Sequence, residues 1–111
     1  MTSIGIAPAV GPGAMAVIFT STLTPGDHGY AQTAEEMVRL ASQQDGFLGV
    51  ESAREANGLG LTVSYWRDEE SIRAWRAHAD HQAAQAAGQA LWYRTYRVRV
   101  CRVEREYGFD K

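Results

Sequence analysis

The chain has 111 residues, 45% of them apolar, and this length and composition favour one globular domain over a disordered chain. Eleven basic and 13 acidic residues give a formal net charge of -2, so no basic excess is available to neutralise a nucleic-acid backbone. The sequence also lacks a membrane-length apolar run and the charged and apolar pattern of a secretion signal. With a single cysteine, Cys101, these features predict a cytoplasmic protein.

The first half of the chain predicts an arm, a strand and a helix. Residues 1–13 contain two prolines and several glycines, which favours a flexible N-terminal arm before a domain that spans residues 14–108. The β-rich run from Ala14 to Leu23 predicts the first strand. After a Pro-Gly turn, apolar residues recur at three- and four-residue spacing from Asp27 to Gln44, which predicts a helix.

The second half predicts a hairpin, a second helix and a long last strand. The runs 47–55 and 59–66 are joined by Asn57-Gly58, a dipeptide that strongly favours a tight hairpin turn. Acidic residues at 68–70 open a helical region that extends to Gly88. Residues 93–107 alternate charged with β-branched and aromatic side chains, which predicts a strand.

The resulting order, βαββαβ, predicts an α+β fold of the ferredoxin-like type. In this fold, two interleaved βαβ units form an antiparallel sheet with both helical regions on one face. The last strand also predicts a homodimer. Its apolar side chains share one parity at 96, 98 and 100 and the opposite parity at 101 and 103, as if they face two environments. A β-bulge within a monomer is the alternative explanation.

Three segments resemble the antibiotic biosynthesis monooxygenase family. They are DGFLGVE (45–51), SYWRDEESIRAWRAHADH (64–81) and YRVRVCRVEREYG (96–108). The resemblance extends over residues 14–107 and implies a dimeric α+β barrel, in which the sheets of two subunits pack face to face. It also implies either oxidation of aromatic polyketides or quinols by dioxygen without metal or flavin or, in one branch, binding and degradation of haem.

Two histidines are candidate catalytic bases. The resemblance favours His81, which follows the helix tryptophan Trp75 where family members often carry a histidine. On an unbroken helix, however, His81 would lie opposite the apolar face, and only a break near residues 79–80 would turn it inward. His78 is the alternative, because it lies at the edge of the apolar stripe, about 60° from Trp75. For either histidine, an ordinary hydrogen-bonded role on the helix surface is the competing interpretation.

Four residues are candidates for substrate binding: Trp66, Trp75, Ser64 and Thr62. Thr62 and Ser64 share a strand face with Trp66, and small hydroxyls beside a large ring suit an apolar pocket with a few orienting hydrogen bonds. The sequence therefore predicts a cavity between this strand face and the second helix. Ordinary core packing is the alternative for both tryptophans.

The resemblance, together with these candidate residues, implies a cofactor-independent monooxygenase that acts on a small aromatic or quinol-type substrate, with no bound metal. The alternatives are a haem-binding or haem-degrading protein and a non-catalytic dimeric protein that binds small molecules. The haem-degrading branch typically carries an asparagine on the first strand. Here residues 17–21 read VIFTS, and this departure weighs against haem degradation without excluding haem binding.

Overall fold

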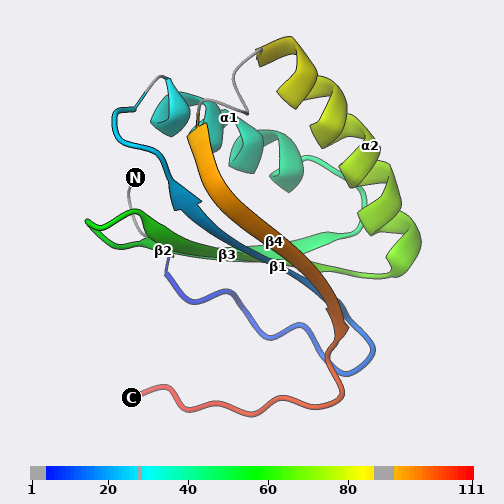
Figure 1. The fold of residues 1–111 in the computed structure, drawn as a ribbon. Coiled ribbons are helices and arrows are strands. Elements are labelled where there is room, and N and C mark those ends of the chain that lie inside the picture. The colour runs from blue at the N-terminus through cyan, green and yellow to red at the C-terminus, as the bar shows by residue number, and fades with distance from the viewer. Residues whose placement is uncertain (1–4, 28, 87–91) are drawn as a thin grey trace.

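The computed structural model describes residues 5–27, 29–86 and 92–111 and contains four strands and two helices in the predicted βαββαβ order. The strands form one antiparallel sheet in the order β2-β3-β1-β4 (Figure 1). The prediction of a ferredoxin-like α+β fold is therefore confirmed. The elements are β1 (Met15–Leu23), α1 (Tyr30–Ser42), β2 (Phe47–Arg54), β3 (Leu59–Trp66), α2 (Glu69–Ala86) and β4 (Tyr93–Arg102).

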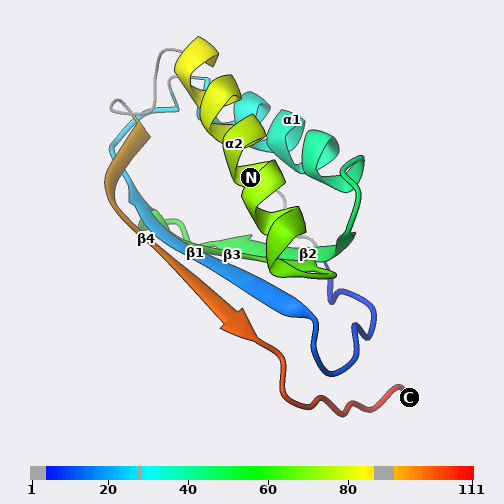
Figure 2. The same cartoon turned by 90° about the vertical axis from the view of Figure 1, so that its right-hand side faces the viewer.

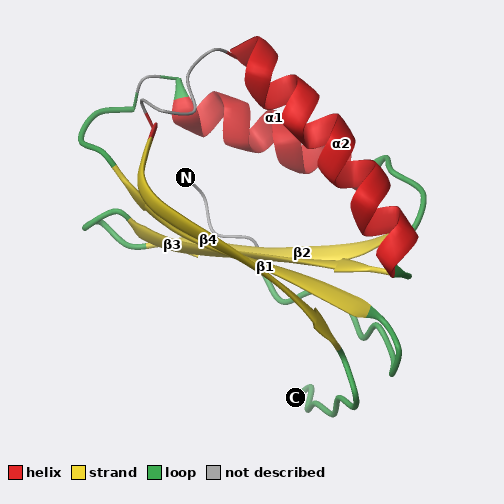
Figure 3. Cartoon of the chain, turned by 45° about the vertical axis from the view of Figure 1, so that its right-hand side comes forward, coloured by secondary structure: helices red, strands yellow, loops and turns green. Residues whose placement is uncertain are grey.

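Both helices cover the same face of the sheet, as predicted (Figure 3). Trp66 marks this helix-facing side, because its ring packs with Ile72 of α2 and Ala41 of α1. Residues directly opposite one another on antiparallel strands share a face. Thr62 of β3 pairs with Phe19 of β1, and Phe19 pairs with Val98 of β4. These three residues therefore form a row on the helix-facing side. The other face carries no helix, and we call it the open face.

The hairpin between β2 and β3 forms where Asn57-Gly58 predicted it. Gly58 has a φ of 97°, a conformation that is accessible chiefly to glycine. The turn is closed by hydrogen bonds from the Glu55 amide to the Leu59 carbonyl and from the Gly58 amide to the Glu55 carbonyl. This turn sets the register that places every second residue of β3 under the helices.

Two predicted boundaries differ from the structure by three residues or more, and the others by two at most where the structure describes them. The first helix begins at Tyr30 and not at Asp27, because Gly29 adopts a left-handed conformation (φ 83°) that cannot belong to a helix. The last strand ends at Arg102 and not at residue 107, because its partner β1 begins at Met15, which pairs with Arg102. One further pair of hydrogen bonds joins Val103 to the Gly13 amide and the Ala14 carbonyl.

The hydrophobic core lies at the end of the sheet where β3 leads into α2. Trp66 has no exposed surface and is surrounded by Met15, Ala41 and Ile72. Partly buried apolar side chains complete this core: Val17, Phe47 and Trp75.

Strand β4 lies at the sheet edge and twists away from the helices (Figure 2). Its helix-facing apolar residues, Tyr96, Val98 and Val100, are each about half exposed, at 48–49%. The bulge that the sequence raised as an alternative is present, but it lies at the start of β4, where the register with β1 shifts between Thr22 and Leu23. The bulge therefore lies before residues 96–103, in which the apolar side chains change from one parity to the other.

Residues 5–13 run along the open side of the sheet, as does the C-terminal tail (Figure 1). The Ala7 amide donates to Glu51 of β2, and the Val10 and Gly11 amides donate to Glu106 of the tail. Glu51 also accepts the Tyr65 hydroxyl at 2.7 Å. The domain boundary at residue 14 stays a prediction, and these contacts identify what deletion of the arm would remove.

Helix α2 runs without interruption from Glu69 to Ala86, so the break near residues 79–80 that the sequence allowed is absent. Asp68 stands immediately before it, and its Oδ1 accepts hydrogen bonds from the Ser71 amide (2.8 Å) and hydroxyl (2.7 Å). This arrangement caps the first turn of the helix. Ser71 also contacts Gly46, where a Cβ would lie 2.0 Å from the serine Oγ, so only glycine fits beside the cap.

We predict that Asp68→Asn removes a pH-dependent part of the stability while keeping the cap. Hydrogen bonds from Ser71, with help from Arg67, lower the pKa of Asp68 to about 2 from its ordinary 3.8. A carboxylate whose pKa is depressed by folding stabilises the native state above its unfolded pKa, and this contribution disappears as the pH falls towards 2. The Tm of the native chain should therefore exceed that of the variant at pH 6, and the gap should close between pH 4 and pH 2.

The comparison is made by thermal unfolding of both proteins across this pH range, so that contributions from the other carboxylates cancel. A gap that stays constant, or that widens as the pH falls, would contradict the assignment of Asp68.

Candidate active site

Three aromatic rings stack in a row from the core along α2. The ring centroids of Trp66 and Trp75 are 6.0 Å apart with an interplanar angle of 23°. Those of Trp75 and His78 are 5.6 Å apart with an angle of 32°. Positions 75 and 78 are three residues apart on a continuous helix and therefore lie on the same face. The structure thus brings together Trp66, Trp75 and His78, as the sequence predicted for His78.

Trp66 is the inner end of this row. Its Nε1 donates to the Ser64 hydroxyl at 2.9 Å, and Phe47 meets its ring edge-on, with centroids 5.5 Å apart. The Trp66 side chain has no exposed surface, so the protein encloses its ring. Core packing therefore accounts for Trp66, and its predicted role as a wall of a substrate cavity stays a prediction.

His78 is the outer end of the row. The side chain is only partly exposed, and Nε2 is buried without a hydrogen-bond partner among the described residues. A buried polar nitrogen that lacks a partner costs free energy, and a ligand group able to share its proton removes that cost. The catalytic role of His78 stays a prediction. The backbone of His81 lies within α2, but its side chain falls outside the described residues.

Thr62 and Ser64 lie on the helix-facing side of β3, as predicted, and both hydroxyls are already engaged. Thr62 pairs with Ser52 of β2 at 2.9 Å, and Ser64 accepts the indole proton of Trp66. A hydroxyl has one proton to donate and two lone pairs to accept with. Ser64 therefore still has its own hydroxyl proton to donate. In the Ser52–Thr62 pair, one hydroxyl proton forms the hydrogen bond and the other remains to be donated.

The sequence analysis missed Arg54, which continues this polar row towards the hairpin. Its guanidinium donates to the Ser21 hydroxyl and the Tyr30 hydroxyl, at 2.7 and 3.1 Å. The alternation of side chains along β2 could have revealed it, because Ser52 and Arg54 are two residues apart and therefore point to the same face. Placing Ser52 on the helix-facing side also places the arginine there.

Among the described residues, no group of three His, Cys, Asp or Glu side chains is arranged to hold a metal ion. A separate search of the described helices finds none that is long and apolar enough to cross a membrane.

The chain is similar to a known protein family and to several known proteins. Residues 14–87 match the family model "antibiotic biosynthesis monooxygenase". The chain is 53% identical over 96 residues to the uncharacterized protein YqjZ of Bacillus subtilis, covering 86% of this chain and 84% of that protein. It is 33% identical over 93 residues to jasmonate monooxygenase ABM of Pyricularia oryzae. That match covers 79% of this chain and 42% of the fungal protein, so the chain spans less than half the length of that relative.

Solved structures show the same fold. SnoaB, a cofactor-independent oxygenase from Streptomyces nogalater, superposes with a TM-score of 0.71 at 14% identity, covering 85% of this chain and 96% of that one. Rv0793 from Mycobacterium tuberculosis superposes with a TM-score of 0.63 at 21% identity, covering 88% and 97% of the two chains. At such identities the likeness establishes the fold alone.

We predict that Trp66 matters more for stability than any other ring of the row. Trp66→Ala should lower the free energy of unfolding by about 3–5 kcal/mol, because it removes a fully enclosed aromatic side chain and leaves a cavity. Trp66→Phe should cost less, since it keeps most of the packing and loses the bond to Ser64. Urea denaturation at constant m-value measures both effects. A loss below about 1 kcal/mol for Trp66→Ala would show that the ring borders open space, because a site that is not packed leaves no cavity.

Proposed function

Because the chain belongs to the antibiotic biosynthesis monooxygenase family, we propose that it is a cofactor-independent monooxygenase that oxidises a small aromatic or quinol-type substrate with dioxygen. The observation that carries this proposal is the buried Nε2 of His78 beside Trp75, which has no hydrogen-bond partner in the described part of the chain. The relatives support the reaction class, since one is described as a jasmonate monooxygenase and SnoaB as a cofactor-independent oxygenase.

The first step of the proposed reaction is removal of a phenolic proton by His78. Imidazole is suited to this role because one ring nitrogen can accept a proton while the other carries one. In its neutral form, Nε2 accepts the substrate proton, and the resulting imidazolium is held next to the phenolate. A positioned base of this kind typically accelerates a reaction by about 10²–10⁴-fold.

The second step is oxidation of the phenolate by dioxygen, and it needs no external reductant. The phenolate transfers one electron to O2, and the substrate radical and superoxide combine to form a carbon–oxygen bond. The peroxide takes the proton from His78 and then loses water, leaving a quinone. One oxygen atom enters the product and the other leaves as water, and the substrate supplies all four electrons that reduce dioxygen.

The surrounding residues would orient the substrate and exclude water. The ring of Trp75 offers a flat apolar surface next to His78, and the free proton of Ser64 would serve as an orienting donor from the strand below. Thr62 would contribute through its pair with Ser52. A few such polar groups in an otherwise apolar site fix the orientation of a ligand.

A non-catalytic protein that binds small molecules in the same place is the competing function. The complete enclosure of Trp66 favours it, because that ring is satisfied by core contacts alone. The two functions differ in whether His78 moves a proton, and this difference makes them experimentally separable.

We predict that the protein deprotonates a bound hydroquinone in the absence of oxygen and that His78→Gln abolishes this step. Hydroquinones are mixed with the protein anaerobically, and phenolate absorbance is recorded before oxygen is admitted and its consumption measured. His78→Gln should lower the rate by about 10²–10⁴-fold, as expected for loss of a general base. With ¹⁸O2, one labelled atom should appear in the quinone.

His81→Gln is the matched control, since it changes the second candidate histidine of the same helix. Loss of activity in His81→Gln with full activity in His78→Gln would overturn the assignment of the base. Binding of hydroquinones without phenolate formation or oxygen uptake would favour the non-catalytic function. A Soret shift on titration with haemin would instead support the haem-binding alternative.

We also propose that two copies associate through their open faces. Leu59 and Leu61 of β3 are 42% and 48% exposed on this face, an apolar surface that association would cover. Arg97 and Arg99 of β4 lie on the same face, because they pair with Thr20 and Ile18, whose side chains point away from the helices. On the opposite edge, β2 carries Glu51. A two-fold axis parallel to the strands would place the basic edge of one copy over the acidic edge of the other, whereas a perpendicular axis would oppose like charges.

We predict that the protein sediments at micromolar concentration as a species of about 24 kDa, which is twice the 12.2 kDa of one chain. Leu61→Asp should dissociate it, because a carboxylate would be buried without a partner. Ala77→Asp is the control, since Ala77 is exposed on α2, away from the open face. A 12.2 kDa species for the unmodified protein would disprove the dimer.

A further inference from the structure

Arg54 carries a positive charge that no carboxylate neutralises among the described residues. Its Nη atoms donate to four neutral oxygens: the carbonyls of Ser21 and Gly58 and the hydroxyls of Ser21 and Tyr30. Its Nε is buried and has no hydrogen-bond partner within residues 5–27, 29–86 and 92–111. The ion pairs of the described chain involve Arg39 and Arg67 and leave Arg54 out. A partly buried guanidinium satisfied only by neutral acceptors keeps its charge available to an anion.

The surroundings hold this guanidinium in place. The ring of Tyr30 lies below it, with Cζ 5.4 Å from the ring centroid. Gly60 lies opposite on β3, where a Cβ would come within 2.4 Å of the Arg54 Cζ. The absence of a side chain at position 60 thus provides the space that the guanidinium occupies.

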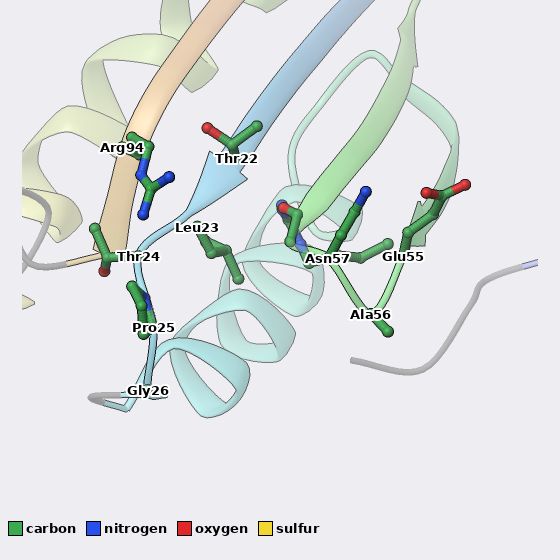
Figure 4. A pocket seen from close by; sticks show the side chains of 11 residues that line it. Thr22, Leu23, Thr24, Pro25, Gly26, Glu55, Ala56, Asn57 and Arg94 are labelled. Atoms are coloured by element: carbon green, nitrogen blue, oxygen red, sulfur yellow. The ribbon is translucent and has the colours of Figure 1, made fainter.

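A pocket of about 540 Å³ opens next to Arg54 at the hairpin end of the sheet. It is formed by the end of β1 with the loop that follows it, by the β2–β3 hairpin, and by the start of β4 (Figure 4). Arg94 is exposed and makes no ion pair with the described residues. It lies on one side of the pocket, and Glu55 lies on the opposite side.

We propose that this pocket binds the carboxylate of a small organic acid. Arg54 and Arg94 against Glu55 leave one net positive charge among the charged side chains of the lining, which matches a monoanion better than a dianion. Arg94 contacts the carboxylate, for which a guanidinium provides two parallel donors. Arg54, which also lines the pocket, supplies additional positive potential.

This site is separate from the one around His78. Gly58 of the hairpin borders the pocket, whereas Trp66 closes the opposite end of β3. The residues that line the pocket include none of the row formed by Trp66, Trp75 and His78. The pocket can therefore be occupied whether or not the protein oxidises a substrate, and its test does not depend on activity.

The experiment measures binding of benzoate to the full-length protein by calorimetry and by the shift in Tm. Benzamide serves as the neutral probe of the same shape, and sodium chloride keeps the ionic strength constant. Benzoate should bind, benzamide should bind at least tenfold more weakly, and inorganic phosphate should bind more weakly than benzoate. Arg94→Gln should weaken benzoate binding at least tenfold.

Two further variants separate charge at the pocket from charge elsewhere. Gly60→Ala keeps both arginines but displaces the Arg54 guanidinium, so it should weaken benzoate binding while the near-UV circular dichroism remains that of a folded protein. Arg73→Gln, which changes an exposed arginine of α2 outside the pocket lining, should leave binding unchanged. Equal affinity for benzoate and benzamide, or equal effects of Arg94→Gln and Arg73→Gln, would overturn the proposal.

Discussion

Burial of Trp66 is the contact on which the arrangement of the other elements depends. This ring stands at the last position of β3, and it packs at once against β1 through Met15, against α1 through Ala41 and against α2 through Ile72. A side chain of this size at a junction of strand and helix fixes where the second helix starts over the sheet. The direction of α2, and with it the location of Trp75 and His78, follows from that starting point.

Much of this arrangement was predictable because it depends on local periodicity. The alternation in β3 placed Thr62, Ser64 and Trp66 on one face, and the turn at Asn57-Gly58 fixed the pairing with β2. The boundaries were less predictable, because they depend on partners distant in sequence. Nothing in the last strand itself indicates that it ends at Arg102, since its length is limited by the start of β1.

The candidate sites show the same division between local and distant information. The position of His78 beside Trp75 followed from helical spacing, whereas the buried state of its Nε2 depends on how α2 packs. Arg54 was missed because its surroundings come from three separate segments. Its hydroxyl partners belong to β1 and α1, and the glycine that makes room for it belongs to β3. A sequence read along one strand does not reveal such a convergence.

The central position of β1 has a consequence for how the chain acquires its structure during synthesis. This strand, the first to leave the ribosome, pairs on one side with β3 and on the other with β4, the last strand of the sheet. Until β4 has been made, one edge of β1 has no strand to pair with, and contacts between such distant segments form slowly. An open strand edge can pair with other chains. The partly synthesised domain is therefore open to such pairing along β1 until β4 has been made, and completion of β4 covers this edge and transfers the edge of the sheet to β4.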